Sequence, residues 1–195
     1  LPMPESWADL ADPVYKGHIV MPTPVSSGTA LLAINGWRHS MGEEKAWEYM
    51  QALHGNIKMY VHSGCKPCQM TAQGEAIIGI ASDTCVRPLL QRKAPIGVVI
   101  PKEGVGWDTE IAAVVKTGLP DGDPRREAAK KVVDFAASKP VSKLAAENAY
   151  IPARSDCMSD EAKQQPARFL PVAFAKAAAN RDAIITKWRG LFERR

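Results

Sequence analysis

Short apolar runs alternate with segments of helical periodicity along the first part of the chain. Apolar residues recur every three or four positions over Gly28–His39 and from Glu43 to just before Gly55, which predicts two amphipathic helices. The apolar runs are predicted strands: Ile19–Met21, Ile57–Val61, Ile77–Ala81, Ile96–Ile100 and Ile111–Val115. Because alternating strands and helices favour a parallel sheet, we predict an α/β fold with a mostly parallel sheet flanked by helices.

The pattern changes after Gly118, where the strand signals stop. Helical periodicity predicts three further helices: Arg125–Ser138, Val141–Asn148 and Val172–Glu193. The stretch 118–124 contains Gly and Pro and is therefore the predicted boundary. We divide the chain into residues 1–117, an α/β lobe, and residues 118–195, a helical C-terminal segment.

Composition is that of a globular chain. With 195 residues, of which 46% are hydrophobic, the chain is long enough to bury one good core. The net charge of +4 is spread along the sequence, and the few basic pairs are typical of solvated helix faces, so no nucleic-acid partner is expected. No apolar run approaches the roughly 20 residues that span a bilayer. The start Leu1-Pro2-Met3-Pro4 lacks a signal-peptide pattern.

The turn after the first predicted strand has the features of an anion site. Ser26-Ser27-Gly28-Thr29 follows a Pro-broken segment and leads into a predicted helix. The first amides of a helix lack intrahelical acceptors, and the helix dipole adds roughly half a positive charge there. Hydroxyls and a glycine that lets the backbone approach complete an oxyanion pocket without a charged side chain. The alternative is that Ser26 or Ser27 serves only as a helix N-cap.

A second junction of the same kind follows the strand predicted at Ile57–Val61. His62-Ser63-Gly64-Cys65 leads into a helical segment, in which Pro67 suits the first turn. In a parallel sheet both junctions lie at the carboxyl edge of the strands, where open α/β sheets bind ligands. Two helix starts directed at one crevice predict a small anionic ligand.

The four cysteines leave several interpretations open. Cys65-x-x-Cys68 has the spacing of a redox pair or of half a zinc site. No second such pair follows, so zinc is not expected and no metal site is predicted. Cys68 is instead expected to be a buried small hydrophobe, or one cysteine to form a structural disulfide, with three full pairings open to four cysteines.

A thiol-dependent enzyme is an alternative from another class of protein. Cys65 or Ser63 would be its nucleophile and His62 its base. Neighbouring residues at a strand end generally point apart, and no acidic residue is evidently placed to orient His62. Both points argue against this chemistry, so we predict that the chain is not an enzyme.

Several segments, in order along nearly the whole chain, resemble a known family. They are Pro4–Leu10, Tyr15–Pro22, Ser26–Thr29, Ala128–Phe135 with Ser138-Lys139, and Tyr150–Arg154. The chain resembles the second lobe and C-terminal segment of a periplasmic solute-binding protein of an ABC importer, of the type 2 fold and the iron(III)/phosphonate branch. Within this branch it is most similar to 2-aminoethylphosphonate-binding proteins, on three further segments: His62-Ser63-Gly64, Lys66-Pro67-Cys68 and Pro101–Asp108.

The resemblance implies two α/β lobes that close on a ligand in the cleft between them. Residues 1–117 would be the second, ligand-binding lobe, residues 118–195 would return toward the first lobe, and the first lobe is expected to be absent from this chain. The implied location is the periplasm, the implied partners are a small anionic ligand and an ABC membrane permease, and no cofactor is expected. The surface left by the missing lobe would favour dimerisation of the fragment.

If the ligand is 2-aminoethylphosphonate, each candidate residue has an expected contact with it. Ser26–Thr29 are expected to bind phosphonate oxygens through hydroxyls and amides, and Ser63–Cys65 to supply a second set of amide donors. Asp83, at the end of a predicted buried strand, is the first choice to bind the ammonium group, with Trp107 as a cation–π wall. The alternative role of Asp83 is a helix cap.

Iron(III) is the alternative ligand within the same family. Ferric binders of this branch present adjacent tyrosines in the second lobe, whereas the tyrosines of this chain are scattered: Tyr15, Tyr49, Tyr60 and Tyr150. The position after Ser82-Asp83 carries Thr84-Cys85 instead. Because Fe(III) prefers phenolate or carboxylate oxygen, the pattern favours phosphonate over iron. A third interpretation is that the lobe by itself is a structural or interaction module.

Overall fold

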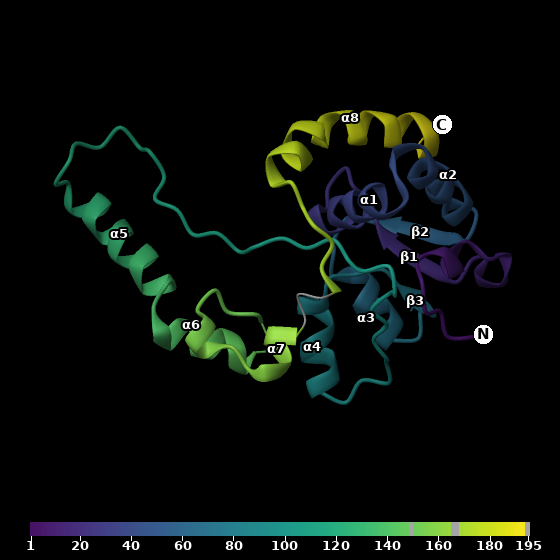
Figure 1. Ribbon diagram of the computed structural model, residues 1–195, viewed down its shortest axis with the longest axis horizontal. Coiled ribbons are helices and arrows are strands. Elements are labelled where there is room, and N and C mark those ends of the chain that lie inside the picture. The colour runs from purple at the N-terminus through teal and green to yellow at the C-terminus, as the bar shows by residue number, and fades with distance from the viewer. Residues whose placement is uncertain (149, 165–167, 194–195) are drawn as a thin grey trace. The chain divides into compact units, whose positions relative to one another are not determined.

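A three-stranded parallel sheet organises the first of two units in the chain (Figure 1). The computed structural model describes residues 1–148, 150–164 and 168–193. The strands are β1 (Ile19–Pro22), β2 (Ile57–Val61) and β3 (Ile78–Gly79), in the order β2-β1-β3. This sheet, with helices between its strands, confirms the predicted α/β fold and its parallel pairing.

The central strand β1 is buried on both faces. The helices of this unit are α1 (Gly28–Met41), α2 (Glu43–His54), α3 (Lys66–Ala72), α4 (Asp83–Gln91) and α8 (Phe174–Phe192). Ile19 and Met21 belong to the larger core, together with side chains of α1, α2 and α8. Val20 points the other way and packs in a smaller core with Met70 of α3. Helices therefore cover both faces of β1, because successive side chains of a strand point to opposite faces.

A buried amide ties the start of the chain to the loop before β2. Two 3₁₀ turns, η1 (Ala8–Ala11) and η2 (Pro13–Tyr15), precede β1. The side-chain nitrogen of Asn56 donates hydrogen bonds to the Leu10 carbonyl at 2.9 Å and to the Asp12 carbonyl at 2.7 Å. The Asn56 amide thus gives both carbonyls the hydrogen-bond donor that a buried polar group requires.

The second unit, Asp108–Ala167, is helical. Its described elements are α5 (Pro124–Ala136), α6 (Lys139–Glu147), η3 (Ser155–Cys157) and α7 (Asp160–Gln164). Asp156 is contacted by Arg154 and by Lys139, whose Nζ lies 3.0 Å from the carboxylate. Hydrogen bonds from Arg154 and Lys139 lower the pKa of Asp156, so this carboxylate stays ionised.

Two predicted strands are wrong. Ile96–Ile100 and Ile111–Val115 have no regular secondary structure, and Ile111 and Val115 are 81% and 76% exposed. A strand exists only when a neighbour accepts and donates its ladder hydrogen bonds, and neither run has such a neighbour among the described residues. The predicted strand Ile77–Ala81 is shortened for the same reason to the two residues that pair with β1.

The two units divide the chain at different positions from the predicted lobes. The first unit comprises Leu1–Trp107 and Arg168–Arg195, so the C-terminal helix α8 packs with the sheet. The assignment of residues 1–117 to a second lobe and of 118–195 to a segment that returns toward a first lobe stays a prediction. No helix within the described ranges is long and apolar enough to cross a membrane.

Candidate anion-binding site

Three strand-to-helix junctions lie at the carboxyl edge of the parallel sheet. We define them as the first junction (residues 23–29, after β1), the second junction (62–65, after β2) and the third junction (80–85, after β3). The strand order places the end of β1 between the ends of β2 and β3. In sheets with this order, ligands bind at the carboxyl edge beside the central strand, where the strand order reverses between β1 and β3.

At the first junction, the first backbone amides of α1 have no hydrogen-bond acceptor among the described residues. The first hydrogen bond of α1 runs from the Leu31 amide to the Ser27 carbonyl at 3.4 Å. In the described part of the chain, the amides of Gly28, Thr29 and Ala30 donate to no acceptor. Ser27 occupies the N-cap position, but its side chain makes no capping hydrogen bond. Three donors and the positive end of the α1 dipole therefore remain available at this edge.

Ser26 connects the first junction to the second. Its Oγ donates a hydrogen bond to the His62 carbonyl at 3.1 Å and lies 3.2 Å from the His62 Nδ1. A hydroxyl has a single hydrogen to donate, and in this arrangement that hydrogen is already engaged with the protein. Ser26 therefore holds the two junctions together, and Ser27 and Thr29 are the hydroxyls better placed to donate to a ligand.

Gly64 brings the second junction into direct contact with the first. A Cβ atom built on Gly64 would lie 2.2 Å from the Thr29 Oγ1 and 3.2 Å from the Ser27 Oγ. Only a residue without a side chain allows this approach. The two junctions predicted from the sequence thus meet at the Ser27 and Thr29 hydroxyls.

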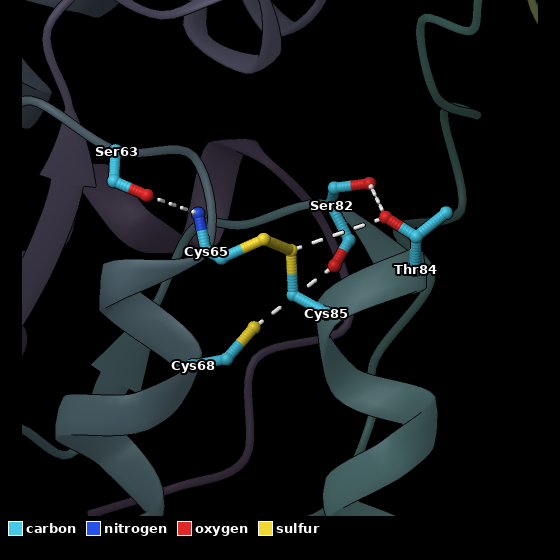
Figure 2. The surroundings of a disulfide bond; sticks show 6 residues. All are labelled: Ser63, Cys65, Cys68, Ser82, Thr84 and Cys85. Carbon is cyan, nitrogen blue, oxygen red and sulfur yellow. Dashed lines mark hydrogen bonds between the residues drawn. A yellow bond between two sulfur atoms is a disulfide. The ribbon is translucent and has the colours of Figure 1, made fainter. Parts of the chain in front are cut away.

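A disulfide between Cys65 and Cys85 joins the second junction to the third (Figure 2). The Cα atoms of the two cysteines are 5.3 Å apart. Beside the bond, the Ser82 and Thr84 hydroxyls lie 2.9 Å from each other. The Cys65 amide donates to the Ser63 Oγ at 3.3 Å. All three junctions are therefore connected, by a hydrogen bond on one side and a covalent bond on the other.

The disulfide decides between the interpretations of the cysteines. The redox pair Cys65–Cys68 is wrong, because Cys65 is bonded to Cys85. Cys68 is free and buried, as predicted, and burial raises the pKa of its thiol. The thiol-dependent enzyme is also wrong for Cys65, because the disulfide leaves this residue without a free thiol, whereas the disulfide does not bear on the alternative nucleophile Ser63.

Asp83 is the one carboxylate within the three junctions. It is the first residue of α4, follows the N-cap Ser82, and its side chain is 67% exposed. Its Oδ2 lies 3.3 Å from an Nη atom of Arg87 one turn further along the helix. An exposed pair of this kind is weak. The carboxylate is thus free to exchange Arg87 for another cation.

Trp107 is engaged by the C-terminal segment. Its Nε1 donates to the Leu170 carbonyl at 2.9 Å, and its ring packs on Phe169 and Phe174 with centroid separations of 5.6 and 5.3 Å. The preceding Gly106 lies against the backbone of α1 at Leu32. These contacts hold the 104–107 loop on α1, and a role of Trp107 in cation binding stays a prediction.

Sequence reasoning missed the hydroxyl pair Ser82 and Thr84 and the pairing of Cys85. A signal for the hydroxyls existed, because Ser82 precedes a helical pattern just as Ser27 does. No local signal identifies the partner of Cys65, since disulfide connectivity depends on distances between elements.

The tyrosine hydroxyls of the first unit make no hydrogen bond to the three junctions within the described residues. Tyr15 and Tyr49 are buried in the larger core, and the Tyr15 hydroxyl donates to the Pro2 carbonyl at 3.1 Å. The Tyr60 hydroxyl lies 2.9 Å from the His54 Nδ1, and burial raises the pKa of Tyr60. Phenolates for ferric iron are therefore not gathered at the junctions by these three residues. Within the described ranges, no group of three or more His, Cys, Asp or Glu is placed to hold a metal ion.

The α/β fold, with its parallel sheet flanked by helices, matches that of periplasmic binding proteins. The chain belongs to the family of bacterial extracellular solute-binding proteins, whose family model matches residues 1–180. This confirms the family that the sequence resembles and its periplasmic or extracellular location.

Individual relatives are similar over most of this chain. An uncharacterized protein of Haemophilus influenzae is 31% identical over 195 residues, which are 95% of this chain and 54% of that protein. A Salmonella typhimurium protein named "Putative 2-aminoethylphosphonate-binding periplasmic protein" is 28% identical over 163 residues, 81% of this chain and 48% of that protein. The chain thus spans about half the length of these relatives.

A solved structure shares the fold. The periplasmic binding protein AfuA of Actinobacillus pleuropneumoniae, with fructose-6-phosphate bound, is 29% identical with a TM-score of 0.79. The superposition covers 99% of this chain and 61% of AfuA. The ferric binding protein of Campylobacter jejuni, at 16% identity and a TM-score of 0.68 over 96% of this chain and 62% of that one, shows likeness of fold alone.

Proposed function

We propose that this chain forms one wall of the ligand site of a periplasmic solute-binding protein of an ABC importer. The first and second junctions bind the phosphonyl or phosphoryl group of a small organic anion, with 2-aminoethylphosphonate as the first candidate. The observation that carries the proposal is the contact of Gly64 with Ser27 and Thr29, beside three amides that have no acceptor in the part of the chain that the structure describes.

The donors match the needs of a tetrahedral oxyanion. A phosphonate presents three oxygens, and the helix start offers the Gly28, Thr29 and Ala30 amides and the Ser27 and Thr29 hydroxyls. Each hydrogen bond to a charged group contributes about 1.5–3 kcal/mol. Micromolar affinity requires about 8 kcal/mol, so a few such bonds are sufficient.

The ligands named for two relatives support this chemistry. 2-Aminoethylphosphonate appears in the name of the Salmonella protein, and fructose-6-phosphate is bound to AfuA. Both compounds carry a phosphorus oxyanion on an organic body. Ferric iron is the second candidate of the same fold, but the placement of Tyr15, Tyr49 and Tyr60 offers it no support. The ABC permease as a partner rests on the family, and dimerisation of the fragment rests on exposed apolar residues such as Ile111.

We expect Ser27→Ala and Thr29→Ala each to weaken 2-aminoethylphosphonate binding by about tenfold or more, because each removes a hydrogen bond to a charged group. A ¹H–¹⁵N NMR titration of the chain measures the affinity and locates the site through the amides of Gly28 and Ala30. Ser40→Ala, at the other end of α1, is the matched control. Unchanged affinity in both variants, or tight Fe(III) binding with no response to phosphonate, would exclude the proposed ligand.

The ammonium group of 2-aminoethylphosphonate allows a test of Asp83. We expect Asp83→Asn to weaken binding of this ligand about two- to fivefold, the range of an exposed ion pair, and to leave inorganic phosphate binding unchanged. The same titration measures both ligands, with Asp134→Asn in α5 as the control. An equal loss for both ligands would show that Asp83 acts on the helix start of α4 and not on the ammonium group.

A further inference from the structure

The Cys65–Cys85 disulfide lies at the start of two helices that border the candidate site. Cys65 is the N-cap residue of α3, and Cys85 is in the first turn of α4. The residue before Cys65 is Gly64, which contacts Thr29 of the first junction. The bond therefore connects the third junction to the point where the first two junctions meet.

The third junction is anchored where it begins, because Ile80 is buried in the larger core and its amide donates to the Val20 carbonyl at 2.9 Å. The helix α4 that follows has less to hold it in place. None of the residues Asp83–Gln91 that form α4 is buried. The strand that precedes this helix, β3, has only the two residues Ile78 and Gly79. Since helices in proteins owe most of their stability to a buried apolar face, α4 by itself has weak anchorage. The covalent bond is thus the strongest connection between the start of α4 and the rest of the site.

We propose that the Cys65–Cys85 disulfide is a positioning element of the anion site, and that its reduction weakens anion binding while the first unit stays folded. Without the bond, the start of α4, which carries Asp83, and the residue that follows Gly64 must be ordered each time a ligand binds, and ordering opposes binding. The proposal rests on the proposed function, because it concerns the affinity of that same site.

The chemistry of reduction is accessible at this position. Cys65 is exposed and Cys85 half-buried, so a small dithiol such as dithiothreitol reaches the bond. One dithiol sulfur attacks a cysteine sulfur, which breaks the S–S bond and forms a mixed disulfide between the protein and the reagent. The second dithiol sulfur then attacks the reagent sulfur of this mixed disulfide and releases the cysteine thiol. Two electrons pass to the protein, Cys65 and Cys85 each end as a protonated thiol, and the dithiol ends as a cyclic disulfide. Cys68, buried nearby, has a raised pKa and is a poor competitor as a nucleophile.

The test compares 2-aminoethylphosphonate affinity in the oxidised chain, in the dithiothreitol-treated chain and in the double variant Cys65→Ser/Cys85→Ser. We expect both chains that lack the bond to bind about tenfold more weakly, equivalent to about 1.4 kcal/mol. Reoxidation of the treated chain restores the affinity. Cys157→Ser, in the second unit, is the control and binds as the oxidised chain does.

The amide signals of β1 and α1 separate a positioning role from a purely structural one. Native signals with unchanged affinity after reduction would overturn the proposal. Loss of these signals would overturn it too, because the disulfide would then hold the fold. If the double variant does not fold, the amide signals and the affinity of the reduced wild-type chain test the proposal instead. No binding by the oxidised chain would instead refute the proposed function, and the proposal with it.

Discussion

Gly64→Ala is expected to lower the affinity of the chain for 2-aminoethylphosphonate by well over tenfold. The new Cβ would lie 2.2 Å from the Thr29 Oγ1 and 2.9 Å from the Thr29 Cβ. Rotation of the Thr29 side chain relieves the first overlap and leaves the second. The start of α1 must therefore move away from the second junction, and the donors separate. Overpacking of this kind also lowers the free energy of unfolding by about 1–3 kcal/mol.

The effect of Gly64→Ala is measured by NMR titration, with urea denaturation to follow stability. Gly97→Ala is the matched control, because a Cβ on Gly97 meets no atom within 4 Å. An affinity equal to that of the wild-type chain would show that the contact between the two junctions plays no part in binding.

Trp188→Ala is expected to lower the free energy of unfolding of the first unit by about 3–5 kcal/mol, the usual effect of removing a buried tryptophan. Trp188 is 2% exposed, and its ring lies 5.2 Å from that of Tyr60 and 4.5 Å from that of Phe192, centroid to centroid. It therefore holds α8 on the core. A stability of 5–15 kcal/mol is typical of a domain, so this loss is a large fraction of the total.

Urea denaturation followed by circular dichroism measures this loss. Leu191→Ala, on the same helix with 38% of Leu191 exposed, is the control and is expected to change stability much less. The Trp188 variant is also expected to bind phosphonate more weakly, because Glu193 at the end of α8 accepts a hydrogen bond from the Thr23 hydroxyl in the first junction at 3.3 Å. A decrease in the free energy of unfolding of less than about 1 kcal/mol is no larger than the effect of many exposed substitutions, and it would show that Trp188 does not hold α8 on the core.

Much of the first unit could be predicted because its signals are local. The apolar periodicity of Gly28–Met41 and Glu43–His54 identifies two helices nearly to the residue. The runs at Ile19 and Ile57 identify two strands. The strands predicted at 96–100 and 111–115 failed because β-prone residues form a strand only beside a hydrogen-bonding partner, and no such partner lies beside them among the described residues.

The sequence by itself determined the donors of the candidate site. Ser, Thr and Gly at two helix starts follow directly from residue type and position, because caps and unpaired amides are properties of a single turn. Only the tertiary structure decided which junctions meet, that Gly64 admits the Thr29 side chain, and that Cys65 pairs with Cys85 and not with Cys68. These facts depend on distances between residues far apart in the chain, and such distances are set by the packing of α1, α3 and α4 around the parallel sheet.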